Sequence, residues 1–496
     1  MQSASHPAEN LGGTSRLFGT QDLIFRSFFI HYYVYSLSDK SYMTENLMDK
    51  IISLCKRRGF VFPGSEIYGG LANSWDYGPL GHILKQNIKA QWWKFFVQER
   101  GDMVPLDTAI IMNPKVWEAS GHLQNFSDLL TECKKCHHRF RADHVLEAAG
   151  KNPNDLKAVV GLVCPDCGGE LTAAKSFNLM FKTFLGTNED TSTTAYLRPE
   201  TAGGMFVNFK NVQSVTRRRL PFGIAQVGKN FRNEITPGNF IFRTREFEIG
   251  EFEYFINPKD WESIFEMWLG EIKRWWKDIM RINMDNLVWH EIPDGERAHY
   301  SKRTVDIEYK YPFGVKELHG IAYRTDFDLS RHQTVSGQDL SYTDPETGEK
   351  YLPHVIEPTF GIDRMVLVML LEAYHEEEAP TAEAGETETR VVMKFPKHLA
   401  PIQVAVLPLS KKEALAGVAK PLADKLRKKF WVEYDETQSI GKRYRRQDEI
   451  GTPYCVTVDF DSIEDHKVTV RDRDTMQQER VALDDLDSYL TQKFAA

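Results

Sequence analysis

The spacing of hydrophobic positions predicts a helix where the chain first becomes densely patterned. Leu47, Ile51, Ile52 and Leu54 recur at helical intervals, so one face of this segment is apolar. Gly59 follows two arginines, and glycine is the residue that most often ends a helix in the left-handed conformation. We therefore expect the helix to end at this glycine.

Two later helices are predicted to carry many large aromatic side chains. Residues 84–98 form an amphipathic pattern with two tryptophans and two phenylalanines, and a strand is expected at 103–112. Residues 261–280 form a tryptophan-rich amphipathic pattern, which we interpret as core packing and not as a cofactor site.

An antiparallel hairpin is predicted between residues 196 and 254. The runs GIAQVGKNF and FIFRTREFEIGEFEYF are strand-like, and the Pro-Gly-containing loop NEITPGN joins them. Strict alternation in the second run places Arg243, Arg245, Phe247, Ile249 and Glu251 on one face. Since two arginines and a glutamate do not make a core face, we expect this face to line a polar cavity.

The last part of the chain predicts a separate α/β domain. Residues 376–390 are acidic with small side chains, which is typical of a solvated linker or loop. Short apolar strands are expected at 402–407, 431–434 and 454–458, with a helix at 411–430 among the segments between them. This alternation predicts a compact α/β domain of about 100 residues.

Length and composition narrow the class of protein. The chain has 496 residues, which is too long for one ordinary domain. With 42% hydrophobic and 27% charged residues it reads as globular, and no run reaches the roughly 18 apolar residues of a membrane span. The net charge of −8 neither indicates nor excludes a nucleic-acid ligand, because phosphate contacts require only a local basic surface.

The first 42 residues form an extension of uncertain status. Residues 25–35 are aromatic and apolar, but a secretory signal would need a basic start and a small-residue cleavage site. Three acidic residues also argue against a mitochondrial presequence, which is normally poor in acids. We interpret the segment as an extension from an upstream start codon, with translation beginning at Met43 or Met48.

Four of the six cysteines predict a metal site. Cys133, Cys136, Cys164 and Cys167 form a C-x2-C-x27-C-x2-C pattern, in which each pair can direct two thiolates at one tetrahedral zinc ion. The gap exceeds the usual 15–20 residues of zinc ribbons, and a vestigial knuckle with unbound thiols is the alternative. Such closely paired thiols are typical of reduced cytosolic proteins, so we expect a cytoplasmic protein.

Two motifs carry the resemblance to a known family. Arg232 and Glu234, followed after a loop by Arg243 and Phe247, resemble motif 2 of the class II aminoacyl-tRNA synthetases. The run GIDR, which ends at Arg364 and leads into an apolar helix, resembles motif 3. Each motif alone is weak, but the two in this order, about 120 residues apart, are specific.

The chemistry of that family explains these residue types. Forming an aminoacyl-adenylate brings a carboxylate to the α-phosphate of ATP, so catalysis depends on positioning and on neutralising charge. A planar guanidinium can bridge both anions. The resemblance implies that Arg232 does so and that Arg364 holds the γ-phosphate. It also implies that Phe247 stacks on adenine and that Glu234 lies near the base or the 3′ end of the tRNA.

Longer phrases resemble the single-chain, homodimeric glycyl-tRNA synthetases. FPGSEIYGGLANSWDYGPLG (62–81), LRPETAGGMFVNFKN (197–211) and EPTFGIDR (357–364) are examples, and the resemblance extends from about residue 44 onward. It implies an α+β class II catalytic core, an antiparallel sheet flanked by helices, over residues 43–375.

The same resemblance implies the rest of the domain organisation. A zinc-knuckle insert would occupy about 127–175, an acidic linker 376–397 and an α/β anticodon-binding domain 398–496. The implied ligands are glycine, ATP with Mg²⁺ and the tRNA for glycine. The implied assembly is a homodimer, with the aromatic-rich helix, the strand after it and Pro114 at the interface.

The resemblance also implies the site residues. Glutamates at Glu200, Glu251 and Glu317 would surround the ammonium group of glycine, and Thr359 with the strand backbone would exclude a Cβ atom. Exclusion must be steric, because one surplus methylene discriminates by only about 1–3 kcal/mol. The implied ATP positions are Arg232, Asn233, Glu234, Phe242, Arg243, Thr244, Arg245, Glu246, Phe247, Glu317, Leu318, Gly361, Ile362, Asp363 and Arg364. The implied glycine positions are Arg100, Glu200, Phe247, Glu248, Ile249, Gly250, Glu251, Glu317, Glu357, Pro358, Thr359, Phe360 and Gly361.

A basic run in the C-terminal domain is the candidate tRNA surface. It consists of Lys442, Arg443, Tyr444, Arg445 and Arg446. Read alone, such a run is usually a solvated face, but in an anticodon-binding domain it suits phosphate contacts and base stacking.

Two alternatives remain open. A non-catalytic, synthetase-like binding protein would be expected to lose the motif arginines, which this chain retains. An enzyme specific for serine, threonine, proline or histidine disagrees with the three glutamates and with the phrase EPTFG.

Overall fold

The computed structural model describes residues 47–152, 155–235, 238–380 and 386–495. The N-terminal extension, residues 1–42, lies outside the described residues. A helix occupies residues 47–58, and Gly59 follows it with φ of 77°, which confirms the predicted glycine cap. The elements discussed below lie in one compact unit, residues 51–496.

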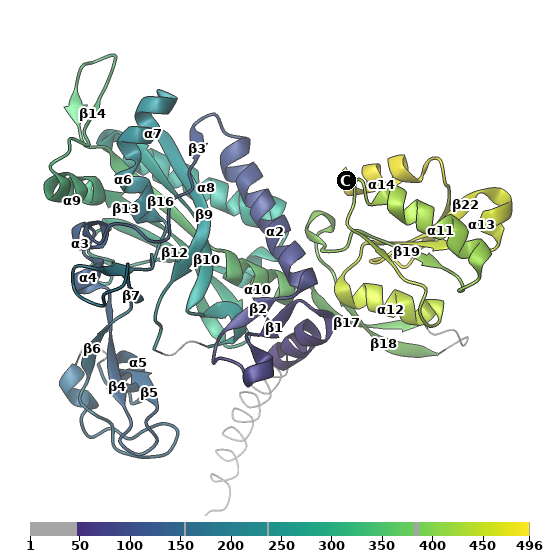
Figure 1. The fold of residues 1–496 in the computed structure, drawn as a ribbon, viewed down its shortest axis with the longest axis horizontal. Helices are drawn as coiled ribbons and strands as arrows, with labels where there is room; N and C mark the ends of the chain where they lie inside the picture. Colours follow the sequence, from purple (N-terminus) through teal and green to yellow (C-terminus); the bar gives the residue numbers. More distant parts are fainter. Residues whose placement is uncertain (1–46, 153–154, 236–237, 381–385, 496) are drawn as a thin grey trace, which may run out of the picture. The chain divides into compact units, whose positions relative to one another are not determined.

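A seven-stranded sheet forms the centre of the larger domain (Figure 1). Its strand order is β11-β12-β13-β16-β10-β9-β3, and every neighbouring pair is antiparallel except β3 with β9. The predicted antiparallel core is confirmed. The strands are β3 (Met103–Pro105), β9 (Phe222–Phe231), β10 (Glu246–Ile256), β11 (Leu287–Glu291), β12 (Arg303–Tyr311), β13 (Gly314–Thr325) and β16 (His354–Gly361).

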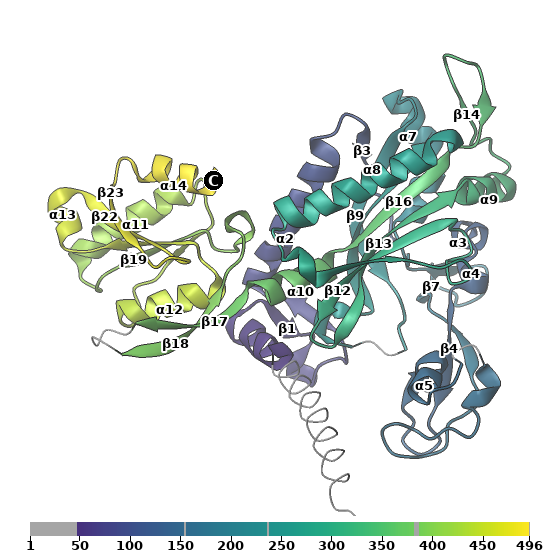
Figure 2. The same cartoon turned by 180° about the vertical axis from the view of Figure 1, so that it is seen from behind.

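Helices cover both faces of this sheet (Figures 1 and 2). On one face lie α2 (Pro79–Trp93), α8 (Trp261–Arg274) and α10 (Ile362–Ala373). On the other lie α6 (Ala202–Val207), α7 (Phe209–Thr216) and α9 (Phe327–Ser336), whose apolar side chains pack on odd-numbered residues of β10 such as Phe255. The central strand β10 is buried on both faces from Ile249 to Ile256, so a polar residue on either face there needs a partner.

The aromatic residues of the 84–98 segment pack inside the chain. Trp92 and Phe96 have no exposed surface, and their rings pack against Phe252 of β10. A Cβ atom on Gly250 would lie 3.1 Å from the Trp92 ring, so the helix approaches the strand as closely as glycine allows. Trp92, Phe95 and Phe96 are therefore unavailable as anchors of a dimer interface, whereas Trp93 is only partly buried and the interface itself stays a prediction.

Two expected element boundaries also differ. After Trp93 the helix widens into a π-helical turn, η2 (Lys94–Gln98), and a similar turn, η6 (Trp275–Ile279), ends α8. The strand expected at 103–112 ends at Pro105, whose nitrogen has no hydrogen to donate to a ladder.

Smaller elements surround the core. The segment expected as an insert contains a three-stranded sheet, β4 (Ser127–Glu132), β5 (Arg139–Arg141) and β6 (Lys175–Asn178), with α5 (Ala142–Ala148). The remaining short elements are β1 (Val61–Pro63), β2 (Trp75–Tyr77), α3 (Lys115–Ala119), α4 (His122–Asn125), β7 (Lys182–Phe184), β8 (Thr194–Tyr196), β14 (Tyr342–Thr343) and β15 (Lys350–Tyr351).

The acidic segment expected as an irregular linker forms two strands. β17 (Tyr374–Pro380) pairs antiparallel with β18 (Thr387–Met393). The prediction of a solvated linker or loop over 376–390 is wrong for the paired residues. Arg390 explains why this segment forms regular strands. Its guanidinium is completely buried and pairs with Glu377 at 3.1 Å and Asp448 at 3.0 Å. The acidic residues are partly the counter-charges of a buried cation.

The C-terminal domain is the predicted α/β unit. Its sheet has the order β20-β19-β21-β22-β23, with the first three strands parallel and the rest antiparallel. Across the described residues, no helix is long and apolar enough to span a bilayer. The strands are β19 (Val404–Pro408), β20 (Val432–Tyr434), β21 (Tyr454–Val458), β22 (Lys467–Asp472) and β23 (Gln478–Ala482), and the helices are α11 (Glu413–Leu426), α12 (Ile440–Ile450), α13 (Asp461–Asp465) and α14 (Leu486–Ala495).

Candidate active site

The loop between β9 and β10 directs its arginines to two different cavities. β10 begins only at Glu246, so Arg243 and Arg245 belong to the loop and not to the strand. Arg243 lines a cavity of about 330 Å³, whereas Arg245 lines a second one of about 900 Å³. The expectation of one common face is wrong for these arginines. Strand alternation holds only from Glu246 onward, so it does not apply to residues 243–245.

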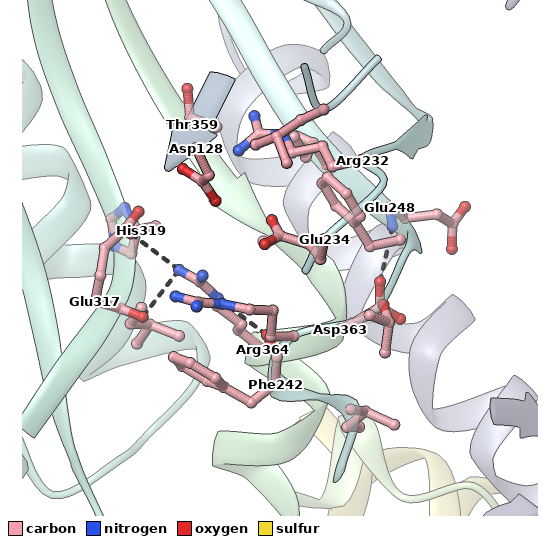
Figure 3. Close-up of a pocket in the computed structure, with 18 of the residues that line it drawn as sticks. Asp128, Arg232, Glu234, Phe242, Glu248, Glu317, His319, Thr359, Asp363 and Arg364 are labelled. Atoms are coloured by element: carbon pink, nitrogen blue, oxygen red, sulfur yellow. Dashed lines mark hydrogen bonds and ion pairs between the residues drawn. The ribbon is translucent and has the colours of Figure 1, made fainter. Parts of the chain in front are cut away.

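The smaller cavity collects most of the side chains expected to bind ATP (Figure 3). It lies among the β9–β10 loop, β13, β16 and the first turn of α10. The expected residues that line it are Arg232, Glu234, Phe242, Arg243, Thr244, Phe247, Glu317, Leu318, Gly361, Asp363 and Arg364. Asn233, Arg245 and Glu246 line the larger cavity instead, and Ile362 is buried in the core.

Arg364 is held rigidly at one end of this cavity. Its Nε donates to the carbonyl of Phe242 at 3.3 Å, and its Nη1 donates to the carbonyl of Glu317 at 3.0 Å. The guanidinium also lies 4.5 Å above the Phe242 ring and 3.3 Å from the Glu317 carboxylate. Arg364 lowers the pKa of Glu317, so this pair is ionised near neutral pH. The result is a fixed, planar cation facing the cavity.

Arg232 lies at the other end with fewer constraints. Its Nε donates to the carbonyl of Pro199 at 3.1 Å, and its guanidinium lies 5.3 Å from the Phe126 ring and 5.4 Å from the Phe247 ring. A cation between two aromatic faces keeps its orientation and can still turn N–H groups toward an anion.

Six residues that line the cavity are not among the expected positions: Phe126, Asp128, Arg141, Leu179, Ile241 and His319. Asp128 and Arg141 belong to the segment 127–175, which the sequence predicted only as a metal-binding insert, and Phe126 directly precedes it. Arg141 and Asp128 form an ion pair at 3.0 Å. Local sequence gave no signal for their position, because it depends on how the small sheet folds back toward β9.

Glu248 and Asp363 form ion pairs on the face of the sheet that α2 and α10 cover. Asp363 accepts hydrogen bonds from Lys85 at 2.8 Å and from the backbone N–H of Glu248 at 2.7 Å. The Glu248 carboxylate pairs with Lys85 at 2.6 Å and Lys89 at 2.8 Å. The expectation that the Glu248 side chain meets glycine therefore disagrees with the structure. These ion pairs join the motif 2 strand to α2 and α10.

Two buried acidic side chains, Glu200 and Glu251, lie beside the cavity, and Glu251 shares the face of β10 that carries the cavity residues Phe247 and Ile249. We refer to this acidic group as the acidic pocket. Glu251 accepts hydrogen bonds from the hydroxyls of Thr359, at 2.9 Å, and Thr201. Glu200 lies 3.2 Å from the ring nitrogen of His122. Burial alone would raise the pKa of Glu200, but its contacts with His122 and nearby guanidinium groups bring it to about 2. Burial and the proximity of Glu200 raise the pKa of Glu251.

Arg324 is the main residue of this pocket that sequence reasoning left without a role. It is almost fully buried and donates to both oxygens of Glu357, at 2.7 and 2.8 Å, and to both of Asp328, at 2.7 and 2.9 Å. The phrase YRTDFDL (323–329) contained the signal, since its arginine and second aspartate are four residues apart. The counter-charge from Glu357 on β16 could not be seen in that phrase.

Several residues that were expected to bind the substrate glycine lie away from Glu200 and Glu251. Glu317 pairs with Arg364 in the nucleotide cavity and does not join Glu200 and Glu251, so the expected trio is a pair. Arg100 lines neither cavity. It pairs with Asp102 at 2.7 Å and lies 4.3 Å from the Trp268 ring on the helical side of the sheet. Its expected contact with glycine disagrees with this position.

Gly250, Pro358 and Phe360 line neither cavity. Phe360 packs its ring at 4.9 Å from Phe96, in the aromatic layer under α2. Pro358 pairs with Ile321 in the sheet, and Gly250 pairs with Phe360. Ile249, Thr359 and Gly361 do line the nucleotide cavity.

The four paired cysteines converge on one point. Their sulfur atoms lie within 4.8 Å of one another, with Cys133 and Cys167 at 3.5 Å and Cys136 and Cys164 at 3.7 Å. The backbone N–H groups of residues 135 and 136 point at the Cys133 sulfur, at 3.3 and 3.4 Å, which favours the thiolate. Four thiolates in this arrangement fit a single tetrahedral metal ion.

The basic run on α12 is largely structural. Arg443 is buried and donates to the carbonyls of Pro408, Asp435 and Leu409 at 2.6, 2.9 and 3.1 Å. The Tyr444 hydroxyl bonds to Thr457 at 2.6 Å. The expectation that both face tRNA is wrong, because α12 packs this side onto β18 and β19.

Of the remaining basic residues in the run, two already have carboxylate partners and one is exposed. Arg445 pairs with Glu388 at 2.5 Å, and Arg446 pairs with Asp435. Lys442 is exposed. Two arginines with existing counter-charges and one exposed lysine make a weaker phosphate-binding surface than the sequence suggested.

Comparisons with known proteins agree with this architecture. Residues 183–374 match the family "tRNA synthetase class II core domain (G, H, P, S and T)", and residues 403–493 match "Anticodon binding domain". Prolyl-tRNA synthetase from Cryptosporidium parvum, in a crystal structure with halofuginone and AMPPNP, has the same fold. Its TM-score is 0.60 at 15% identity, covering 90% of this chain and 76% of that one.

Much closer relatives are found by sequence. Glycine–tRNA ligase from Thermobifida fusca is 54% identical over 90% of this chain and 98% of its own length. The protein of the same name from Streptomyces coelicolor is 53% identical over 91% and 99%, and that from Acetivibrio thermocellus is 55% identical over 90% and 98%. With a class II core, an anticodon-binding domain and this similarity over about 90% of its length, the chain belongs to the glycine–tRNA ligase family of class II aminoacyl-tRNA synthetases.

Proposed function

We propose that this protein activates glycine with ATP, releasing pyrophosphate, and transfers the glycyl group to the 3′ end of the tRNA for glycine. One observation carries the proposal. Two arginines, Arg232 and the more tightly held Arg364, face a cavity that adjoins the buried acidic side chains of Glu200 and Glu251. Cations for a triphosphate and anions for an ammonium group are thus available on one sheet.

Positioning and charge neutralisation explain the first step. Arg232 would bridge the glycine carboxylate and the α-phosphate, reducing the repulsion between the two anions as the acyl–phosphate bond forms. Arg364, clamped by Phe242 and Glu317, would hold the γ-phosphate end, and Phe247 would pack on the adenine. Fixed cations need little reorganisation as charge develops, which is the main source of electrostatic catalysis.

Mg²⁺ is the expected companion of ATP. Oxygen donors suit this ion, and Asp306, Glu308 and Glu317 gather on β12 and β13. Burial, Glu317 and Glu308 raise the pKa of Asp306 to about 7, so an added cation would relieve crowded negative charge. When bound, Mg²⁺ would offset phosphate charge next to these carboxylates.

The acidic pocket accounts for the choice of glycine. An ammonium group would lie between Glu200 and Glu251, and Thr359, which donates a hydrogen bond to Glu251, would form the wall that a Cβ atom meets. A closed polar wall rejects larger amino acids by steric conflict, which apolar contact alone does poorly.

The second substrate and the assembly follow from the remaining surfaces. We place a catalytic domain at 43–375 and an anticodon-binding domain at 398–496, with the β17–β18 pair in the 376–397 junction.

We also propose a cytoplasmic homodimer. Ile67, Tyr68 and Leu71, exposed by 88%, 86% and 65%, lie on the loop between β1 and β2 and supply an apolar contact for a second copy. A monomer in sedimentation at micromolar concentration would refute the dimer.

We propose that the four-cysteine site holds a structural zinc ion. Tetrahedral thiolate coordination is the usual zinc arrangement, and all four sulfurs are present. Elemental analysis of the purified protein decides the identity and stoichiometry of the ion. One equivalent of iron, or no metal with four titratable thiols, would contradict zinc.

ATP–pyrophosphate exchange with each of the twenty amino acids tests the function. We expect exchange with glycine and background with the other nineteen. Exchange with serine, threonine, proline or histidine would identify a different specificity. No exchange with any amino acid, in protein that is folded, would favour the non-catalytic alternative.

A further inference from the structure

A cluster of three buried carboxylates lies behind the proposed ammonium pocket. Glu251 and Glu253 come from β10 and Glu357 from the neighbouring β16, and one oxygen of each lies within 4.8 Å of the other two. Their side chains are exposed by 2%, 0% and 5%. Residues two apart on a strand point to the same face, which brings Glu253 to the pocket that contains Glu251.

Two of these carboxylates have donors and the third has none. Glu251 accepts from two threonine hydroxyls, and Glu357 accepts from Arg324 with both oxygens. Neither oxygen of Glu253 has a hydrogen-bond partner among the described residues. An ionised carboxylate buried without donors costs several kcal/mol, whereas a carboxylic acid carries no net charge to desolvate.

The cation that faces Glu253 is already paired with other carboxylates. Glu357 faces it from β16, Arg324 from β13, Asp328 from α9 and Glu251 from its own strand. Both sides of the Arg324 guanidinium are already occupied by Glu357 and Asp328. Burial, and next the charge of Glu357, raise the pKa of Glu253 well above its ordinary value.

The other titratable groups around Arg324 do not change this balance. Tyr300, whose ring lies 3.9 Å from the Arg324 guanidinium, has a pKa raised chiefly by burial. His332 on α9 has a pKa lowered chiefly by burial. Both shifts favour the uncharged side chain near neutral pH, so neither group supplies a cation to Glu253.

Building on the proposed function, we propose that Glu253 is a neutral carboxylic acid whose O–H donates a hydrogen bond to Glu357, and that it thereby positions the pocket for the glycine ammonium group. The strand register supports the pairing, because Glu251 lies opposite Thr359 and Tyr254 opposite Ile356. Glu253 and Glu357 therefore lie at the same level of the two strands.

A proton fits this cluster better than a metal ion. Three carboxylates within 4.8 Å could also hold a divalent cation. However, Arg324 donates two hydrogen bonds to Glu357, and a guanidinium at that distance would repel a second cation from the same carboxylate. A single proton satisfies Glu253 without adding a competing positive centre.

The neutral state of Glu253 matters for Glu251. Neighbouring carboxylates raise one another's pKa, so an ionised Glu253 would favour protonation of Glu251. A protonated Glu251 would lose the charge that attracts an ammonium group. With Glu253 neutral, the negative charge stays where the substrate enters.

Two substitutions of similar size separate this role from simple packing. Glu253→Gln keeps an uncharged side chain that can donate to Glu357, so the KM for glycine should stay within about threefold of wild type. Glu253→Leu removes the donor and should raise that KM about tenfold or more, with the KM for ATP unchanged. Equal effects of both variants on the glycine KM would overturn the proposal.

Infrared spectroscopy tests the proton independently of activity. At pH 8 the wild-type protein should show a carboxylic acid C=O band that is missing from Glu253→Gln, and thermal unfolding of both proteins confirms that they are folded. An unchanged band, or a divalent ion lost on this substitution, would overturn the neutral acid. If wild type fails to activate glycine, the proposed function fails, but the infrared result still decides the protonation of Glu253.

Discussion

At the scale of single residues, the two arginines of the nucleotide cavity differ in how they are held. Arg364 has two backbone carbonyls, an aromatic ring and a carboxylate as partners. Arg232 has one backbone carbonyl and two flanking rings. The first arrangement suits a fixed anchor, and the second suits a group that must meet two substrates at once.

This difference leads to a prediction for Arg232. Arg232→Ala should reduce glycine-dependent pyrophosphate exchange by about 100-fold or more, the usual effect of losing one preorganised charge stabiliser. The fold should survive, because the residue makes one hydrogen bond to the protein. Arg245→Ala is the matched control, since Arg245 lines the other cavity and should change exchange by only a few-fold. Exchange within about tenfold of wild type, or 1.4 kcal/mol, would contradict the assigned role of Arg232.

Arg443 gives a prediction of the opposite kind. Its guanidinium donates to three backbone carbonyls, so Arg443→Ala would leave buried acceptors without donors, each costing about 1–3 kcal/mol. We expect a large loss of stability of the C-terminal domain in urea unfolding. Lys442→Ala, next to it and exposed, should leave stability unchanged. A stable Arg443→Ala protein with weakened tRNA binding would restore the original interpretation of this run.

These residues show how far sequence patterns reach. The motif phrases predicted the residue types of the nucleotide cavity, because their chemistry is specific. They did not predict that Arg443 faces inward, since a helix with four cations in five positions shows no apolar face to identify the packed side. Glu317 was misplaced for a related reason, because its partner Arg364 lies far along the chain. Arg100 pairs with the nearby Asp102, but the ring of the distant Trp268 also packs against it.

At the scale of elements, the β4–β6 insert contributes to the nucleotide cavity. Phe126, Asp128 and Arg141 line it, and the cysteine knuckles close the same small sheet. The metal should therefore hold these cavity residues in place. The sequence predicted the knuckles from their spacing but could not show this contact with the core.

The cysteine cluster can be tested through this link. Cys133→Ser should release the metal and loosen the insert, and the KM for ATP should rise by several-fold as Arg141 and Asp128 lose their position. Cys55→Ser is the control, because Cys55 is a buried single thiol outside the cluster. Metal content and ATP kinetics are the measurements. Full metal retention in Cys133→Ser would contradict the four-thiolate site.

At the scale of the whole molecule, the β17–β18 pair joins the two domains by specific contacts. Asp448 on α12 pairs with both Arg390 of β18 and Arg471 of β22, and all three are buried. A Cβ atom on Gly451 would lie 2.5 Å from the Phe395 ring, so the end of α12 is also close-packed. Composition suggested a loose linker because it shows charge but not which charges are paired.

These contacts predict where the chain can be shortened. Adenylate formation needs no tRNA, so a chain that ends at Ala373 should keep glycine-dependent pyrophosphate exchange and lose most tRNA charging. A chain that ends at Lys397 keeps Arg390 and its ion pair with Glu377 but removes Asp448, its second carboxylate partner, and the packing of α12 on β18. We expect this longer chain to be the less stable of the two in thermal unfolding. If it is instead as stable as the shorter chain, β17 and β18 fold independently of α12 and the acidic segment acts as a simple linker after all.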